Sequence, residues 1–561
     1  MSDKQIQGPQ MPIVLLKEGA QETKGKDAQR NNITAAKIVA EILRTSLGPR
    51  GLDKMLVDPI GDVTITNDGA TILKEIDAQH PAAKMLVEVA KSVDNEVGDG
   101  TTSAVVIAGS LLDKAEELLN KQVHPTIIVD GYESASEQAL KLLEKIAVKV
   151  DLEDKELLMK VARTSMYSKL VSEDSPILSE IAVDATKQVA EINGGGALRV
   201  DLDNIKVEKK AGGSIHDTRL IKGIVLDKEV VHSGMPKRIK DAKIALLSSP
   251  LEIEKTEMSA EIRINQPQQM QRFLDEENRM FKSMVDKITT SGANVVVCQK
   301  GVDDMAQHYL SNSGILGVRR TKESDMLKLA KATGASIVNN LDDLTSKDLG
   351  SADLVEERKI ETDKWVFIEG CKNPKAVTIL VRGGSQRVVD EAERSVHDAL
   401  MVTKAVLEEP EIVAGGGAPE AYIANELRGW SSSLEGRAQL AAHKFADALE
   451  AVPIALAENA GMDPIDSMTE LRAKQEKGDK WTGIDVTNTK VSDMFKRNVV
   501  EPVAVKEQII KSATEAASMI LRIDDVVAAG KSKAPAGPPP GGGGAGYGGY
   551  GGGYGGEGME E

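Results

Sequence analysis

One short segment combines an acidic side chain, flexible glycines and three hydroxyls, which are groups able to handle a phosphate. It is Gly98-Asp99-Gly100-Thr101-Thr102-Ser103, and the nearly apolar run up to Leu112 predicts that it leads into a buried helix. Free backbone N–H groups at a helix N-terminus favour an anion. Asp99 would repel that anion unless a cation lies between them, and Mg²⁺ prefers one or two carboxylates together with phosphate oxygens. The pattern therefore indicates Asp99 as a Mg²⁺ ligand.

Taken alone, the same six residues also suit an ordinary turn in which an Asp or Thr caps the next helix. Two further glycine turns are equally ambiguous: Leu47-Gly48-Pro49-Arg50-Gly51 is typical of a helix stop, and Gly415-Gly416-Gly417 of a flexible connector. The P-loop pattern GxxxxGK[ST] is absent, because Gly25-Lys26 lacks the following hydroxyl residue and Gly530-Lys531-Ser532 lacks the earlier glycine. No single motif decides between a nucleotide site and simple turns.

Hydrophobic spacing predicts the elements that would position these residues. Helices are expected over about 27–45, 385–407, 419–456 and 503–523. A short strand of β-branched residues is expected at Val63–Thr66, followed by the turn signal Asn67-Asp68-Gly69, which places Asp68 on a strand-to-helix turn. Between about 220 and 377, short β-type runs such as 243–247 and 294–298 alternate with helical patterns, which predicts an α/β domain.

Five motifs follow one another along the chain: LGPxG from Leu47, TNDGAT from Thr66, GDGTT from Gly98, DAL from Asp398 and GGG from Gly415. Together they resemble the group II chaperonins, the family of archaeal thermosomes and eukaryotic cytosolic chaperonins, over about residues 12–526. The chain looks most like an archaeal thermosome subunit. The resemblance implies a multidomain, mainly α chaperonin fold and an ATP-dependent chaperone that binds unfolded polypeptides, encloses them with a built-in lid and is driven by Mg-ATP hydrolysis.

The resemblance also implies roles for the positions that match the family's motifs. Asp99 would bind Mg²⁺, and Lys169 would sense the γ-phosphate and offset its charge. Asp68 and Asp398 would position and polarise the attacking water, although Asp398 alone is typical of a solvated helix residue. Residues expected to contact the nucleotide are Leu47, Gly48, Pro49, Gly100, Thr101, Thr102, Ser103, Gly415, Gly416, Gly483, Asp485 and Glu501.

Within that set, the resemblance separates the nucleoside contacts from the phosphate contacts. Gly415 and Gly416 would let the nucleoside approach the backbone closely, and Glu501 would receive the ribose hydroxyls. The loop with Gly483 and Asp485 matches the adenine side of the family's site. Without the family, Glu501 would pass as an ordinary surface carboxylate.

Candidate nucleotide residues lie before and after the α/β segment, so the chain must leave the ATP domain and return to it. This predicts a discontinuous equatorial ATP-binding domain (1–152 and 412–530), an intermediate hinge domain (153–222 and 376–411), an apical α/β domain (223–375) and a disordered Gly/Tyr-rich tail (531–561). The family resemblance implies that the apical domain carries a helical lid protrusion at about 250–285. Asp398 would then lie on the hinge, so that closure and hydrolysis become one event.

A Met-rich pattern in the apical segment suits contact with many polypeptides. Residues at helical spacing are Met270, Phe273, Leu274, Met280, Phe281, Met284, Val285 and Ile288. In an ordinary domain these side chains would be buried in the core, and we expect such burial from Met280 onward. For Met258 to Phe273 we expect exposure in the open state, because flexible Met side chains suit promiscuous apolar contacts.

Composition and charge exclude several other classes of protein. The formal net charge of −17 disfavours nucleic acid as the main partner. Cys298 and Cys371 belong to no CxxC or Cys/His cluster, so neither a disulfide nor a zinc site is expected. The polar start and the lack of an apolar run of about 20 residues predict a cytoplasmic protein with no membrane partner.

The expected assembly is a back-to-back double ring of this subunit, alone or with paralogous subunits, and about eight or nine per ring. The lid protrusion predicts that no separate lid co-chaperonin is needed. Two rival classes are an ATP-dependent enzyme such as a kinase, which needs a pocket for a second substrate, and a filament-forming assembly protein, which needs no turnover. The sequence offers no second-substrate signature, and intact Asp68 and Asp398 argue against the filament.

Overall fold

The structure, a computed structural model, describes residues 21–58, 60–76, 78–169, 172–192, 194, 196, 198–253, 267–372 and 374–528. Its chain forms two compact units. In the smaller unit, strand β1 (Gln21–Lys24) pairs antiparallel with β21 (Asp525–Ala528). The larger unit spans residues 30–522. The predicted tail and residues 254–266 of the predicted lid protrusion, Met258 among them, lie outside the described residues.

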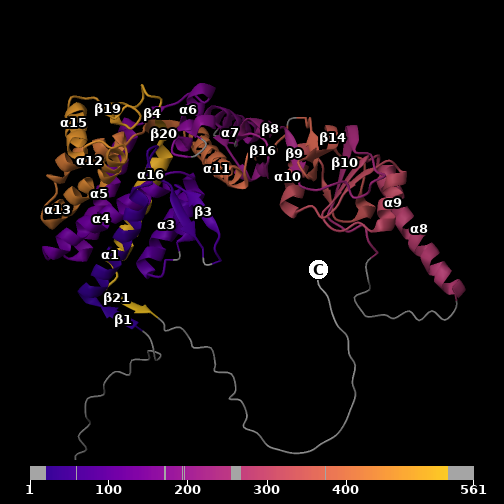
Figure 1. Cartoon of the computed structure of the whole chain (residues 1–561), viewed down its shortest axis with the longest axis horizontal. Coiled ribbons are helices and arrows are strands. Elements are labelled where there is room, and N and C mark those ends of the chain that lie inside the picture. Colours follow the sequence, from indigo (N-terminus) through magenta and orange to yellow (C-terminus); the bar gives the residue numbers. More distant parts are fainter. Residues whose placement is uncertain are drawn as a thin grey trace, which may run out of the picture. The chain divides into compact units, whose positions relative to one another are not determined.

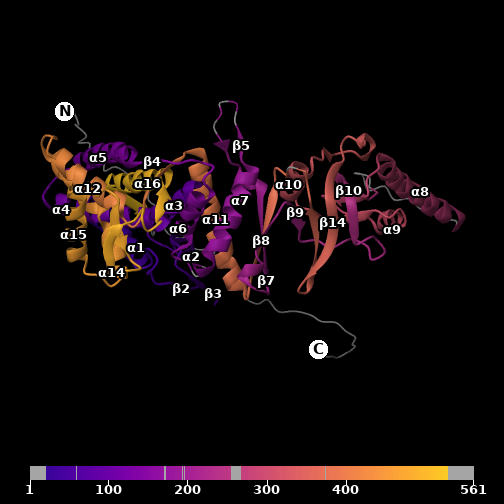
Figure 2. The same cartoon turned by 90° about the horizontal axis from the view of Figure 1, so that it is seen from above.

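Most helices of the larger unit surround one apolar core, which segments from both ends of the chain build together. In Figures 1 and 2 the indigo and purple helices lie side by side with the orange and yellow ones, so the chain leaves this core and returns to it. These helices are α1 (Gly25–Arg44), α2 (Gly69–Glu75), α3 (Pro81–Val97), α4 (Thr101–Asn120), α5 (Pro125–Ile146), α12 (Ala418–Ser431), α13 (Arg437–Leu449), α14 (Ala451–Asn459), α15 (Pro464–Glu476) and α16 (Val503–Leu521).

Small sheets lie among these helices and carry several of the predicted site residues. The strands are β2 (Lys54–Val57) with β3 (Val63–Thr66), β18 (Thr482–Asp485) with β19 (Lys490–Asp493), and β17 (Glu411–Ala414) between β20 (Val500–Pro502) and β4 (Val148–Lys149). All these pairs are antiparallel. The register places Val413 opposite Glu501, so Glu501 lies beside the glycine run that follows β17.

A second group of elements joins the helical core to the α/β region. Helix α11 packs against α6 and α7, and against the sheet in which β16 pairs parallel with β7 and antiparallel with β8. The elements are α6 (Lys155–Met166), α7 (Ser175–Val189), α11 (Gln386–Glu408), β7 (Ile205–Ala211), β8 (Arg219–Ile221), β16 (Val377–Gly383), and the short pair β5 (Glu191–Ile192) and β6 (Leu198–Arg199).

The predicted α/β segment forms a mixed sheet with its own apolar core. The strand order is β12-β11-β10-β14-β15-β9, with β13 beside β10; the β12-β11-β10 pairs are parallel and the others along this path antiparallel. Its elements are β9 (Gly223–Leu226), β10 (Arg238–Leu247), β11 (Val295–Cys298), β12 (Leu316–Val318), β13 (Ile337–Val338), β14 (Gly350–Ile360), β15 (Asp363–Glu369), α8 (Pro267–Ser291), α9 (Asp304–Asn312) and α10 (Glu323–Thr333).

Helix α8 divides the Met-rich stripe between solvent and core. Met270 and Phe273 are exposed, as expected, and Phe281 is buried against the α/β core. The prediction that burial begins at Met280 is wrong for Met280 itself, which is 43% exposed. Figures 1 and 2 both show the N-terminal half of α8 running outward from the sheet, where none of the described helices or strands covers it.

Local signals explain where the site-bearing helices begin and end. Asp68 caps α2 through its side chain, as the strand-to-helix turn predicts, and Gly98 ends α3 with φ 69°. The predicted helix over 419–456 is instead three helices, because Gly436 breaks it at a φ of 71° and a turn separates α13 from α14. Both cysteines are buried and unpaired. Among the described residues, no helix combines the length and apolarity required to cross a bilayer.

Candidate nucleotide-binding site

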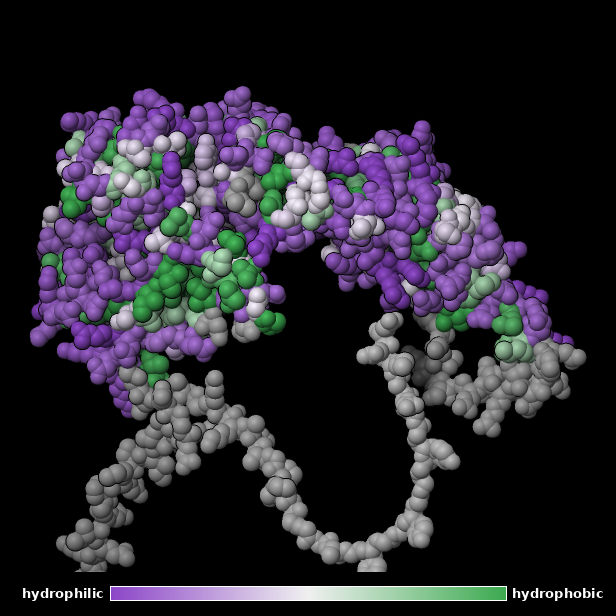
Figure 3. Space-filling view, viewed as in Figure 1, coloured by the Kyte–Doolittle hydropathy of each residue, from purple (hydrophilic) through white to green (hydrophobic). Residues whose placement is uncertain are grey.

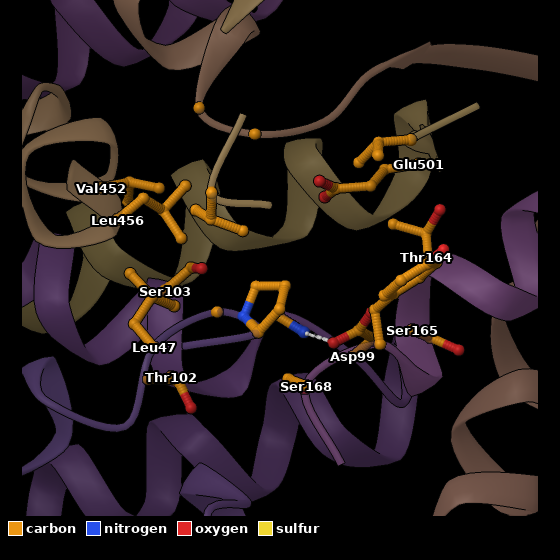
Figure 4. A pocket seen from close by; sticks show the side chains of 18 of the residues that line it. Leu47, Asp99, Thr102, Ser103, Thr164, Ser165, Ser168, Val452, Leu456 and Glu501 are labelled. Carbon is orange, nitrogen blue, oxygen red and sulfur yellow. Dashed lines mark hydrogen bonds between the residues drawn. The ribbon is translucent and has the colours of Figure 1, made fainter. Parts of the chain in front are cut away.

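A pocket with a cavity volume of about 350 Å³ lies where the glycine turns meet, within the range of small-molecule sites, which is roughly 300–1,000 Å³. Figure 4 shows Leu47, Val452 and Leu456 together on one side of it, and Glu501 and Thr164 on another. The predicted residues that line the pocket are Leu47, Gly48, Pro49, Asp68, Asp99, Gly100, Thr101, Thr102, Ser103, Lys169, Asp398, Gly416, Asp485 and Glu501. The fold thus gathers residues from distant parts of the sequence.

The turn between α3 and α4 presents backbone N–H groups to the pocket. Gly100 is the N-cap of α4 with φ 82°, and no side chain caps the helix. A Cβ at Gly100 would come within 2.5 Å of Ile509, so both conformation and space require glycine. The N–H groups that follow in α4 therefore lie at an uncapped helix start, the kind of position that favours an anion.

The turn that carries Asp68 packs directly on this helix start. Asp68 Oδ2 accepts hydrogen bonds from the Thr71 N–H at 2.8 Å and the Thr71 hydroxyl at 2.7 Å, which fixes its carboxylate. A Cβ at Gly69 would lie 2.4 Å from the Thr102 hydroxyl, so glycine permits this close contact. Asn67, which sequence reasoning did not single out, donates to the Ser168 carbonyl and ties the turn to the segment before Lys169.

Lys169 and Asp398 form a buried ion pair across 229 residues of sequence. Burial acts to lower the pKa of Lys169, but the Asp398 and Asp68 carboxylates outweigh it and raise that pKa above its usual range. Burial raises the pKa of Asp398 well above its usual value; Lys169 opposes this rise, and the negative charge of Asp68 adds to it. The Lys169 ammonium therefore interacts electrostatically with both the Asp398 and the Asp68 carboxylates.

Asp99 lies at the start of the α3–α4 turn, and Figure 4 shows its carboxylate accepting a hydrogen bond from the Gly100 N–H at 2.6 Å. Removal from bulk water raises the pKa of Asp99, while Lys169 and the Gly100 hydrogen bond oppose the rise. Asp68, Asp99 and Asp398 face this part of the pocket with Lys169 as their neighbouring cation. Among the described residues, no three His, Cys, Asp or Glu side chains are arranged so that they could hold a metal ion by themselves. A Mg²⁺ ion here would therefore take one or two carboxylates and complete its coordination with phosphate oxygens and water.

Other predicted residues shape the part of the pocket around the glycine run. Gly416 has φ 65°, and its carbonyl accepts from the Ile484 N–H at 2.9 Å, which joins the glycine run to β18. The Asp485 carboxylate accepts from Arg497 Nε at 2.8 Å and from the Asn488 side chain at 2.9 Å. Burial raises the pKa of Asp485, but the Asn488 hydrogen bonds outweigh burial and the net shift is downward, so Asp485 is held ionised.

Gly415 and Gly483 do not line the pocket, in contrast to the other predicted residues, and their predicted contact with a nucleotide stays a prediction. They lie directly behind its wall: a Cβ at Gly483 would be 2.8 Å from the Gly416 carbonyl, and a Cβ at Gly415 would be 2.6 Å from Glu501 Oε1. Glycine at position 415 thus makes room for the Glu501 side chain. The physical requirement is close packing of chain segments, which a sequence motif does not distinguish from contact with a ligand.

Sequence reasoning missed several lining residues, of which Lys506 is the most notable. It is buried, and its ammonium contacts Glu420 Oε1 at 2.8 Å and Glu501 Oε2 at 2.5 Å. A usable signal was a lysine directly after the apolar residues Val503-Ala504-Val505 at the start of α16. Further lining residues that were not predicted are Ser46, Asn67, Thr164, Ser165, Tyr167, Ser168, Gly417, Val452, Leu456, Ile484, Val486, Thr487, Asn488, Met494, Arg497 and Val499.

Comparison with known proteins identifies the class of protein that this fold and pocket define. The model of the TCP-1/cpn60 chaperonin family matches residues 39–531. The chain belongs to this family, and the resemblance inferred from the five motifs is confirmed.

Curated relatives narrow the similarity to archaeal thermosome subunits. The chain is 58% identical to a thermosome subunit of Methanopyrus kandleri over 524 residues, which cover 93% of this chain and 96% of that protein. It is 57% identical to thermosome subunit alpha of Archaeoglobus fulgidus over 529 residues, 94% of this chain and 97% of the relative. Thermosome subunit beta of Thermococcus kodakarensis is 58% identical over 520 residues, 93% and 95% of the two chains.

Proposed function

We propose that this chain is an ATPase subunit of a double-ring group II chaperonin, in which Mg-ATP hydrolysis drives the enclosure and folding of unfolded polypeptides. The single observation that supports this most strongly is the pocket, which combines an uncapped helix start at Gly100 with the acidic residues Asp68, Asp99 and Asp398 and with Lys169. Phosphoryl transfer depends mainly on positioning and charge stabilisation, and this set can supply both.

Each polar group has a distinct proposed task. The α4 N–H groups and the Thr101 and Thr102 hydroxyls hold the phosphates, and Asp99 would hold Mg²⁺, whose charge would offset that of the phosphate oxygens. Asp68, fixed by Thr71, orients the attacking water. Asp398 polarises that water and accepts its proton on a carboxylate oxygen.

The ion pair of Lys169 and Asp398 would couple ATP hydrolysis to a movement of α11. Asp398 lies on α11, which packs mainly on α6, α7 and the β7-β16-β8 sheet and also contacts α3 and α16 beside the pocket. A nucleotide phosphate that attracts Lys169 would free Asp398 for catalysis. We therefore expect α11 to carry the catalytic carboxylate into place as the proposed hinge closes.

Exposed apolar side chains support the proposed binding of polypeptides and of neighbouring subunits. Met270, Phe273 and Leu274 on α8 are exposed and suit an unfolded chain. Figure 3 shows an apolar patch over the β2–β3 part of the helical region, where Met55 and Val57 are exposed, and such a surface suits a further subunit. We place the complex in the cytoplasm and propose that no separate lid is needed.

Refolding of a chemically denatured model protein tests the proposal. The native protein, its Asp398→Ala variant and its Asp390→Ala variant are compared at equal ATP occupancy with Mg²⁺. Asp390 lies on the same helix, α11, but pairs with Lys209 outside the pocket. We expect the native protein and Asp390→Ala to hydrolyse ATP and raise the refolding yield, and Asp398→Ala to do neither. Equal hydrolysis by all three with no gain in refolding would contradict the proposal.

A further inference from the structure

Lys506 lies in the first turns of α16 between two carboxylates. Its Nζ is 2.8 Å from Glu420 Oε1 and 2.5 Å from Glu501 Oε2. The side chains of Lys506 and Glu420 are only 5% and 4% exposed, whereas that of Glu501 is 19% exposed. These residues, called the Glu420–Lys506–Glu501 triad below, connect the start of α12 to the pocket through a buried ammonium.

The triad presents one carboxylate oxygen to the pocket. Lys506 contacts Oε2 of Glu501, and Oε1 lies on the side where Gly415 leaves room for it. Figure 4 shows the Glu501 carboxylate pointing into the pocket. A carboxylate oxygen held in this way can accept a hydrogen bond from a ligand hydroxyl without first reorganising.

Burying the triad carries a larger free-energy penalty than a simple buried ion pair would. It carries one more negative charge than positive, and Glu420 Oε2 is buried without a hydrogen-bond partner among the described residues. Burial raises the pKa of Glu501, and Lys506 opposes that rise. An apolar pair of similar volume would avoid both penalties, so the arrangement indicates that the direction of the Glu501 carboxylate matters.

We propose that Lys506 is a positioning residue that holds the Glu501 carboxylate toward the sugar of the bound nucleotide, and that the triad thereby sets the preference for ribonucleoside over deoxyribonucleoside triphosphates. This inference rests on the proposed function, because it needs a nucleotide in the pocket. Glu420 acts through Lys506 by fixing its ammonium from the opposite side. A site built to accept a hydroxyl proton discriminates against ligands that lack the hydroxyl.

The unmodified full-length protein provides the first test. Equilibrium binding is measured with ATP, 2′-deoxy-ATP and 3′-deoxy-ATP in the presence of Mg²⁺. We expect at least one deoxy analogue to bind about tenfold more weakly than ATP, the size expected for one lost hydrogen bond to a charged group. Equal affinity for all three would overturn this inference while leaving the proposed ATPase intact. If ATP itself does not bind, the proposed function fails.

The Lys506→Met variant provides the second test. We expect the ratio of the deoxy-ATP and ATP dissociation constants to fall from about tenfold to about twofold, because Glu501 is no longer held in place. The KM for ATP should rise by a larger factor than kcat falls. A role in structure alone would weaken all three nucleotides alike and keep the ratio, which would overturn the proposal.

Two further variants, Glu420→Gln and Glu501→Gln, test the role of Lys506 independently. If Lys506→Met does not fold, Glu420→Gln decides in its place, because it removes one buried charge at nearly constant shape. A fall in the ratio supports the proposal, and an unchanged ratio overturns it. In a Glu501→Gln background, Lys506→Met should no longer alter the ratio, whereas an independent effect there would contradict the action of Lys506 through Glu501.

Discussion

Two buried lysines contact the pocket, and they are held in different ways. Lys169 pairs with Asp398, which lies on α11 and is the residue proposed to polarise the attacking water. Lys506 is held between Glu420 and Glu501, which both belong to the elements around the helical core. The first pair must separate for Asp398 to work, whereas the second serves best by staying intact. Under the proposed mechanism, the Lys169 side of the pocket would rearrange and the Lys506 side would remain fixed.

Among the predicted effects, the largest should follow from removing the Asp398 carboxylate, which the proposed mechanism requires to move. Asp398→Ala is expected to lower kcat for ATP hydrolysis by about 10³-fold, because proton acceptance and water polarisation are lost. The dissociation constant for Mg-ATP should change little by comparison. Steady-state phosphate release and equilibrium binding measure the two quantities, with Asp390→Ala as the control on the same helix. Normal turnover in Asp398→Ala would remove Asp398 from the chemistry.

Asp99→Asn should weaken binding of Mg-ATP by about 10- to 100-fold, because the proposed metal would lose a charged ligand. Nucleotide binding in EDTA should be much less affected, since no metal then bridges the carboxylate and the phosphates. Calorimetric titration with and without Mg²⁺ checks this difference. The matched control is Asp113→Asn, on the same α4 helix but paired with Lys37 away from the pocket. Equal losses with and without Mg²⁺ would contradict the assigned role.

Gly100→Ala should destabilise the turn and weaken nucleotide binding. Its φ of 82° is unfavourable for alanine, and the new Cβ would clash with Ile509, which together cost about 1–3 kcal/mol of unfolding free energy. Chemical denaturation monitored by circular dichroism measures this cost. Gly429→Ala provides the control, because Gly429 lies within α12 with open space around its Cβ position and should gain stability. Equal effects at both glycines would argue against a strained turn at Gly100.

Asp94→Asn should change the free energy of unfolding slightly, and the size of this change should depend on pH. Burial, with the nearby Asp68 carboxylate, raises the pKa of Asp94, so its charged form destabilises the folded state above that pKa and the penalty disappears as pH falls through it. The variant should therefore be more stable at pH 7 by about 0.5–1 kcal/mol, and the difference should shrink toward pH 4. Thermal unfolding across this pH range checks the sign. A difference that grows toward low pH would contradict it.

The sequence could indicate Asp68, Asp99 and the residues that follow Asp99 as pocket-lining residues, because these groups come from local turns. Their roles toward a phosphate stay predictions. Asp68 and Asp99 each follow a glycine or precede one within a short motif, and a turn's geometry depends mainly on its own residues. Asp398 has no such local signal, and only the family resemblance indicated it. The structure adds that this aspartate pairs with Lys169, a contact that requires the fold to bring two distant segments together.

The nucleoside side was predicted less completely because its geometry depends on packing between elements. Gly415 was expected beside the nucleoside, yet it makes room for Glu501 behind the wall. Lys506 went unpredicted although Glu501, one of its partners, lies only a few residues earlier, because its burial depends on Glu420, 86 residues earlier in the chain. The start of the buried part of α8 was wrongly predicted at Met280, which is exposed. Helical spacing does not show where the sheet stops covering a helix. The domain boundaries stay predictions.

The most direct test of the account is a structure of the full-length protein with Mg²⁺ and a non-hydrolysable ATP analogue. We predict the triphosphate at the start of α4, Mg²⁺ on Asp99, Lys169 moved from Asp398 to the terminal phosphate, and Lys506 still between Glu420 and Glu501. A pocket that stays empty at saturating analogue, or a Lys169–Asp398 pair that persists while the Lys506 contacts break, would contradict it.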